Sequence, residues 1–181
     1  MRNNQPVTNN EYLVPDGEML VSVTDVKGRI TYCNPVFVAV SGYAAHELMG
    51  QPHNIVRHPD MPEEAFRDLW ATVQAGRPWT GLVKNRRKNG DFYWVQANAA
   101  PLMDGDRITG YLSVRGVPDR ASVQAAEALY ATLRAEAARG SLVHVLRHGR
   151  VVRRDAAGRL AALLHVNTRM RVAGLQGTAA L

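Results

Sequence analysis

Strand-like runs bracket a block of helical patterns in this sequence, and that order restricts the fold more than any other feature. Residues 19–25 and 29–34 are rich in β-branched and aromatic residues and flank the turn Asp25-Val26-Lys27-Gly28. Three further strand-like runs follow the helical block, at residues 79–87, 92–102 and 107–117. Short glycine-containing turns between such runs are typical of β-hairpins. We therefore predict an α+β fold, with one five-stranded antiparallel sheet and short helices covering one face.

The block between the strands changes from a period of two to helical spacing. Residues 34–43 and 44–50 each contain a short helical pattern that ends at glycine. The clearest pattern covers residues 62–76, with proline in the first turn, two glutamates after it and glycine at the end. A C-terminal helix is predicted over residues 122–140. Beyond it, only weak hairpin-like apolar runs are visible.

Composition limits the chain to one well-formed core. It has 181 residues, of which 46% are hydrophobic, and its single cysteine, Cys33, excludes an internal disulfide and fits a reducing compartment. No signal-peptide pattern is visible at the polar N-terminus, and no apolar run reaches the ~20 residues that cross a bilayer.

The net charge of +6 is concentrated at one end of the chain. Residues 1–138 have 14 Lys and Arg against 15 Asp and Glu, whereas residues 139–181 have eight Arg against Asp155 alone. A basic segment beside the apolar run VAGLQGTAAL favours a juxtamembrane position on the cytoplasmic side, near anionic lipid. A solvated or disordered tail is the alternative. No aromatic residue interleaves with these arginines, so nucleic-acid binding is not expected.

The segment HNIVRHPDMP, residues 53–62, has the densest group of polar side chains. Pro59 keeps His58 and Asp60 apart and Arg57 would repel a cation, so a metal site is not expected. No nucleophile motif such as G-x-S-x-G occurs, so we do not expect an enzyme. Arg57 and His58 can instead donate to phosphate oxygens, with Asp60 holding them or meeting a ribose hydroxyl. The alternative is a turn in which Asp60 caps the next helix.

Alternation around the turn at residues 88–91 predicts the other wall of that site. If the turn is a three-residue bulged turn, Asn85 pairs with Val95 and lies on a face of small residues, which leaves room for a flat ligand. A two-residue turn would instead place Trp94 opposite Asn85. In the first case Phe92 and Trp94 lie on the outer face of the sheet. The N-terminal segment, a second copy of the chain or a downstream signalling domain would cover these aromatic residues.

The order of elements and the residues in their turns resemble a PAS domain. The matching pieces are DVKGRITYCN, SGYAAHELMGQP, RHPDMP, the helix with Phe66 and Trp70, GRPW, RRKNGDFYWV and GDRITGYLSVR. More narrowly, GQPHNIVRHPDMP and LVKNRRKNGDFYWV look like the sensor domain of bacterial aerotaxis receptors, members of the methyl-accepting chemotaxis family. The resemblance implies an N-terminal cap segment at 1–17, a PAS sensor domain at 18–118, a linker helix at 119–140 and a basic juxtamembrane-like tail at 141–181.

That resemblance implies a non-covalently bound FAD whose redox state is sensed without catalysis. The residues expected at the cofactor are Asn34, Arg57, His58, Asp60, Phe66, Trp70, Trp79, Asn85, Tyr93 and Tyr111. It also implies a homodimer, a downstream HAMP and signalling module with the chemotaxis kinase complex, and a place at the cytoplasmic face of the inner membrane. The alternatives are a PAS domain that binds haem through His58, one that binds another small ligand, or a ligand-free interaction module.

Two positions distinguish the chain from the flavin photoreceptors of related fold. Those proteins have a reactive cysteine in the run that corresponds to HNIVR, where this chain has Ile55. Cys33 ends a strand, where a small buried hydrophobic residue is the usual role. The photoreceptors also have a glutamine at the position of Arg115. Covalent photochemistry is therefore not expected.

Overall fold

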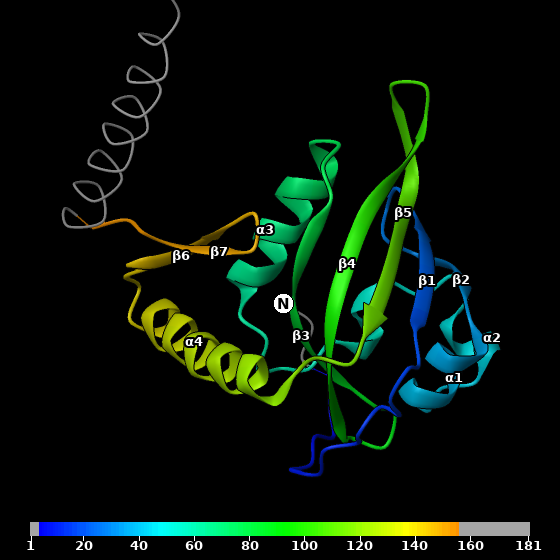
Figure 1. Cartoon of the computed structure of the whole chain (residues 1–181), viewed down its shortest axis with the longest axis horizontal. Helices are drawn as coiled ribbons and strands as arrows, with labels where there is room; N and C mark the ends of the chain where they lie inside the picture. Colours follow the sequence, from blue (N-terminus) through cyan, green and yellow to red (C-terminus); the bar gives the residue numbers. More distant parts are fainter. Residues whose placement is uncertain (1–3, 156–181) are drawn as a thin grey trace, which may run out of the picture.

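The computed structural model describes residues 4–155, and its centre is one five-stranded antiparallel sheet (Figure 1). The order of the strands in space is β2-β1-β5-β4-β3, so β5 joins the N-terminal pair to the later strands. The predicted five-stranded α+β fold is confirmed. The strands are β1 (Leu20–Asp25), β2 (Ile30–Cys33), β3 (Trp79–Arg86), β4 (Phe92–Asp104) and β5 (Arg107–Gly116).

The helical block lies between β2 and β3 in the chain, as predicted. It consists of α1 (Pro35–Ser41), α2 (Ala45–Leu48), the 3-10 helix η1 (His53–Val56) and α3 (Glu63–Gln74). After β5 the chain forms α4 (Arg120–Ala138) and a separate hairpin of β6 (His144–Arg147) and β7 (Arg150–Arg153). Within residues 4–155, no helix is long and apolar enough to cross a membrane.

The turn between β3 and β4 sets the register of both strands. The Arg87 N–H donates to the carbonyl of Asp91 (2.7 Å), and the Gly90 N–H donates to the carbonyl of Arg87 (3.0 Å). The loop therefore has three residues, as predicted, and Gly90 ends it at a φ of 104°, which favours glycine. Asn85 nevertheless pairs with Tyr93, so the predicted pairing with Val95 is wrong. The error is two residues, and each side chain keeps its predicted face.

Helix α4 covers the outer face of β3 and β4. The Trp94 ring stacks on Tyr130 with 6.2 Å between centroids, and the Tyr130 hydroxyl donates to the carbonyl of Leu82 (2.6 Å). The segment predicted as a linker helix therefore covers Trp94, which none of the three expected coverings included. The N-terminal segment contributes at the edge, where the Tyr12 N–H donates to the carbonyl of Phe92 (2.7 Å).

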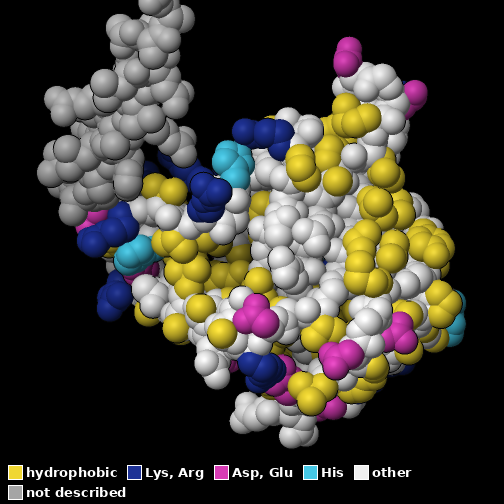
Figure 2. All heavy atoms as spheres, in the orientation of Figure 1, with side chains coloured by type: hydrophobic (Ala, Val, Ile, Leu, Met, Phe, Trp, Pro, Cys, Tyr) yellow, Lys and Arg dark blue, Asp and Glu magenta, His cyan; other side chains and the backbone are white. Residues whose placement is uncertain are grey.

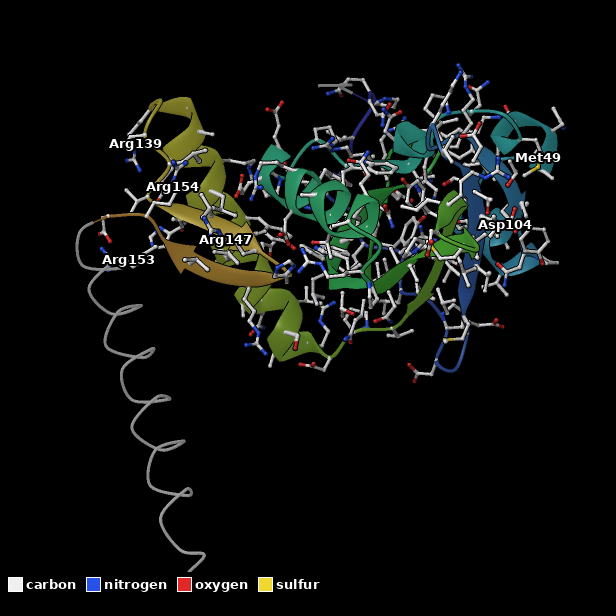
Figure 3. The ribbon with its side chains drawn as sticks, turned by 90° about the horizontal axis from the view of Figure 1, so that it is seen from above. Met49, Asp104, Arg139, Arg147, Arg153 and Arg154 are labelled. Carbon is white, nitrogen blue, oxygen red and sulfur yellow. The ribbon has the colours of Figure 1, made fainter. Side chains whose placement is uncertain are left out.

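The β6–β7 hairpin lies between α3 and α4 (Figure 1). Exposed arginines gather on it and at the end of α4, which the space-filling view and the side-chain view both show (Figures 2 and 3). These include Arg139, Arg147, Arg153 and Arg154. The predicted basic tail thus begins on ordered structure, whereas the apolar run that follows it lies outside the described residues.

Candidate functional site

A cavity of about 350 Å³ lies between the inner face of the sheet and the segment that contains η1 and α3. Its size is within the range of small-molecule sites. Small side chains from β4 and β5 leave the space open: Ala97, Ala99 and Ser113 line it. The predicted face of small residues therefore borders a cavity.

Aromatic side chains form the apolar part of the cavity wall. Trp70 of α3 meets Tyr111 of β5 edge to face, with 5.3 Å between ring centroids. Gly28 allows the Trp70 ring to approach the β1–β2 turn, because a Cβ there would lie 3.1 Å from the ring. Phe66 lines the cavity as well, beneath the Arg57 guanidinium at 3.7 Å from the ring centroid.

Several polar atoms in the cavity wall are buried without a hydrogen-bond partner. They are Nε and Nη2 of Arg57, Nδ2 of Asn85 and Oγ1 of Thr24. Arg57 and Asn85 lie side by side, since their backbones form an isolated antiparallel bridge. Burial lowers the pKa of Arg57 to about 10, so its guanidinium stays charged at pH 7. Buried donors normally have acceptors, so a ligand with acceptor atoms fits this wall.

A second polar group lies in the wall around Arg115, which was not among the predicted cofactor residues. The Arg115 guanidinium is buried and donates to Ser22 Oγ (3.0 Å) and to His53 Nε2 (2.9 Å). Burial, together with the charge of Arg115, lowers the pKa of His53 to about 3, so its ring is neutral. Arg115 follows Tyr111 at the strand period of two, and that spacing could have identified it.

The lining residues give the cavity a positive charge. They include Lys27, Arg57 and Arg115 and contain no carboxylate. Within residues 4–155, no ion pair joins Arg57 or Arg115 to an acidic side chain. The same part of the chain contains no cluster of histidine, cysteine and acidic side chains that could hold a metal ion. The wall therefore suits an anionic organic ligand.

Five of the ten predicted cofactor residues line the cavity and five do not. Those that line it are Arg57, Phe66, Trp70, Asn85 and Tyr111. Those outside the cavity lining are Asn34, His58, Asp60, Trp79 and Tyr93.

His58 and Asp60 connect the Arg57 segment to the outer face of the sheet. His58 Nδ1 accepts from the Asp60 N–H (3.1 Å), and the His58 ring meets Phe92 edge to face. Burial, followed by the charge of Lys84, lowers the pKa of His58 to about 4. The Asp60 carboxylate accepts from Lys84 Nζ (2.8 Å), and Arg134 of α4 donates to the Asp60 carbonyl. These contacts hold the segment that presents Arg57.

Of the other three residues, Asn34 and Trp79 have hydrogen-bond partners within residues 4–155, whereas the buried Tyr93 hydroxyl has none there. Asn34 Oδ1 caps α1 by accepting from the Phe37 N–H (3.0 Å), which was the alternative interpretation of this residue. Trp79 donates through Nε1 to Asp68 (2.9 Å). Tyr93 is fully buried and burial raises the pKa of its hydroxyl.

Comparisons with known proteins agree with this fold. Residues 30–115 match the family model described as the PAS fold. A light-oxygen-voltage domain studied with a flavin analogue aligns with a TM-score of 0.55 at 23% identity, over 67% of this chain and 89% of its own. A PAS domain from Colwellia psychrerythraea aligns with a TM-score of 0.51 at 24% identity, over 55% of this chain and 86% of its own. The chain therefore contains a PAS domain.

Its sequence is similar to two signalling proteins in particular. It is 47% identical to the aerotaxis receptor of Escherichia coli over 157 residues, which are 87% of this chain and 30% of that receptor. It is 28% identical to the nitrogen fixation regulatory protein of Klebsiella pneumoniae over 92 residues, 51% of this chain and 19% of that protein. The chain thus spans less than a third of either relative.

Proposed function

We propose that this chain is the sensor part of a chemotaxis-type receptor, and that its PAS domain binds FAD non-covalently and reports its redox state without catalysis. The observation that carries the proposal is the cavity with unpartnered donors of Arg57 and Asn85 beside an aromatic wall. The similarity to an aerotaxis receptor over 87% of the chain supports the receptor role.

The polar and aromatic parts of the wall fit the two parts of FAD. The Arg57 guanidinium, with two buried unpartnered nitrogens, and Lys27, which lines the same cavity, suit a diphosphate. The slot between Trp70 and the alanines of β4 suits a flat ring. Arg57 and Lys27 would thus hold the anionic part and Trp70 the ring.

We propose that the Asn85 amide contacts the flavin ring and responds to its redox state. A bound flavin would supply a reversible electron acceptor, with a ring nitrogen that accepts a hydrogen bond when oxidised and donates one when reduced. A side-chain amide can meet both states, because one end donates and the other accepts. The Asn85 amide nitrogen is buried in the cavity wall and lacks a partner, so it is free to make such a contact.

The receptor context is part of the same proposal. A homodimer, a downstream HAMP and kinase-control module, and attachment at the inner membrane would follow from a receptor role. The exposed arginines at the end of α4 and on the β6–β7 hairpin suit anionic lipid headgroups. We keep the proposed limits of 1–17, 18–118, 119–140 and 141–181 for the segments.

The flavin content of the purified full chain tests this proposal. We expect the two absorption bands of a flavin, and FAD rather than FMN on chromatography after denaturation, at about one FAD per chain. A sharp Soret band would instead indicate haem. Protein that binds neither FAD nor haem when supplied with them would support a ligand-free interaction module and overturn the proposal.

A further inference from the structure

Helix α3 presents two different stripes of buried side chains. The stripe that lines the cavity consists of Phe66, Leu69, Trp70 and Val73. A second, polar stripe consists of Glu64, Asp68 and Thr72, which are spaced four residues apart and therefore lie on one face of the helix. They are only 7%, 3% and 2% exposed. Such burial is unusual for the two acidic side chains, Glu64 and Asp68. No part of the cavity uses this polar stripe.

The polar stripe binds the backbone of the β6–β7 hairpin. The two oxygens of Asp68 accept from the His148 and Gly149 N–H groups, each at 2.7 Å. Glu64 Oε1 accepts from the Leu146 N–H (2.9 Å). Hydrogen bonds from N–H groups to a buried carboxylate are charge-assisted and directional. The position of the hairpin therefore depends on the position of α3.

The hairpin is also held from its other side. On α4, Glu136 Oε2 accepts from the Val143 and His144 N–H groups at 2.9 and 2.8 Å. Gly149 lies so close to β3 that a Cβ at this residue would be 2.4 Å from the Thr80 carbonyl oxygen, and its φ is 75°. The hairpin thus joins α3, α4 and the edge of the sheet.

We propose that the β6–β7 hairpin is a docked output element, which transmits the position of the cavity-lining helix α3 to the residues that follow Arg153. This inference rests on the proposed function, since the ligand in the cavity is taken to be FAD. A ligand that packs against Trp70 and Phe66 biases where α3 lies. A shift of α3 lengthens the bonds from Asp68 and Glu64 to the hairpin amides and favours an undocked hairpin, whose amides bind water instead.

Thermodynamic linkage gives this proposal a quantitative form. If FAD favours the docked hairpin, then a docked hairpin must favour FAD by the same factor. A change at Asp68, which faces away from the cavity, should therefore alter FAD affinity. We expect Asp68→Asn to weaken FAD binding threefold to tenfold, although the residue does not line the cavity.

Hydrogen exchange of the full chain, loaded with FAD, tests the coupling. We expect the amides of Leu146, His148 and Gly149 to exchange at least threefold faster in one redox state than in the other, with dithionite as the reductant. Asp68→Asn should accelerate their exchange in both states and reduce the difference between the states. Asp104→Asn, the same substitution at the exposed end of β4, is the matched control and should change neither exchange nor affinity.

Gly149→Ala is a second variant, which tests the proposal if Asp68→Asn does not fold. It undocks the hairpin without a substitution in α3. Its Cβ collides with the Thr80 carbonyl, so we expect the same faster exchange and weaker FAD binding. Equal exchange of the three amides in oxidised and reduced wild type, or unchanged FAD affinity in Gly149→Ala, overturns the output role and leaves the proposed function intact. Wild-type protein that binds no FAD overturns both.

Discussion

Arg57 has two guanidinium nitrogens that are buried in the cavity wall and lack partners. We expect Arg57→Ala to lose charge-assisted hydrogen bonds of about 1.5–3 kcal/mol, a tenfold to hundredfold loss of FAD affinity. Riboflavin, which lacks the diphosphate, should bind wild type and variant alike. Fluorescence titration measures both ligands. Arg107→Ala, at an exposed arginine of β5, is the control and should bind FAD like wild type. Equal losses for FAD and riboflavin would contradict a phosphate role.

The prediction for Asn85 concerns the response to reduction of the flavin more than the affinity for FAD. Asn85→Ala should keep more FAD than Arg57→Ala but respond less to reduction. Asn85→Asp should bind oxidised FAD poorly, because an ionised carboxylate can only accept hydrogen bonds. Limited proteolysis of α4 and the hairpin in oxidised and dithionite-reduced protein measures the response. A full redox response in Asn85→Ala would remove this residue from the mechanism.

Among the elements, α4 has the largest role that the sequence did not reveal. It covers Trp94 through Tyr130 and also binds the Asp60 carbonyl through Arg134. The outer face of β3 and β4 is thereby part of the core, and the segment predicted as a linker helix packs on the sheet.

We expect Trp94→Ala to reduce the free energy of unfolding by about 3–5 kcal/mol, because it removes a buried ring stacked on Tyr130. Tyr130→Phe keeps the stacking and loses one hydrogen bond, so it should cost only about 1 kcal/mol. Urea unfolding measures both. FAD content at low temperature should stay near that of wild type, since Trp94 lies on the face opposite the cavity. Loss of FAD from folded Trp94→Ala protein would contradict this arrangement.

At the scale of the whole molecule, two neutral histidines make stability depend on pH. The pKa of His53 is lowered to about 3 and that of His58 to about 4, chiefly by burial. In the unfolded chain each takes up a proton near pH 6.5, so the unfolded state binds more protons below that pH. Stability is therefore complete above pH 6.5 and falls towards pH 4, by up to about 1.4 kcal/mol per pH unit for each histidine.

His58→Asn separates this effect from general acid denaturation. The Asn oxygen can replace His58 Nδ1 as the acceptor for the Asp60 N–H but does not titrate in this range. We expect the slope of the free energy of unfolding between pH 6.5 and pH 4.5 to fall by about half. Urea denaturation at several pH values measures this slope. An unchanged slope would show that His58 is not buried in its neutral form.

Local sequence patterns were enough to predict the helices and strands and the side chains that share a face. The period of each run, the glycine turns and the aromatic residues around them predict the five-stranded α+β sheet, and Asn85 keeps its inward face despite a register error of two. These features depend on neighbours in the chain, so a local pattern reveals them. Of the ten residues that the resemblance to a PAS sensor domain implied at the cofactor, those at 57, 66, 70, 85 and 111 line one cavity.

Tertiary packing, by contrast, sets which polar residues face the cavity and which ones hold the elements around it. His58 and Asp60 are adjacent to Arg57 in the chain, yet they contact Phe92 and Lys84 on the other side of the sheet. Arg115 reaches the cavity from a strand 58 residues further along the chain. The partners of Asp68 are backbone amides about 80 residues away, which carry no side-chain pattern to read. The contacts of His58, Asp60 and Asp68 depend on how distant segments pack, and sequence spacing does not encode them.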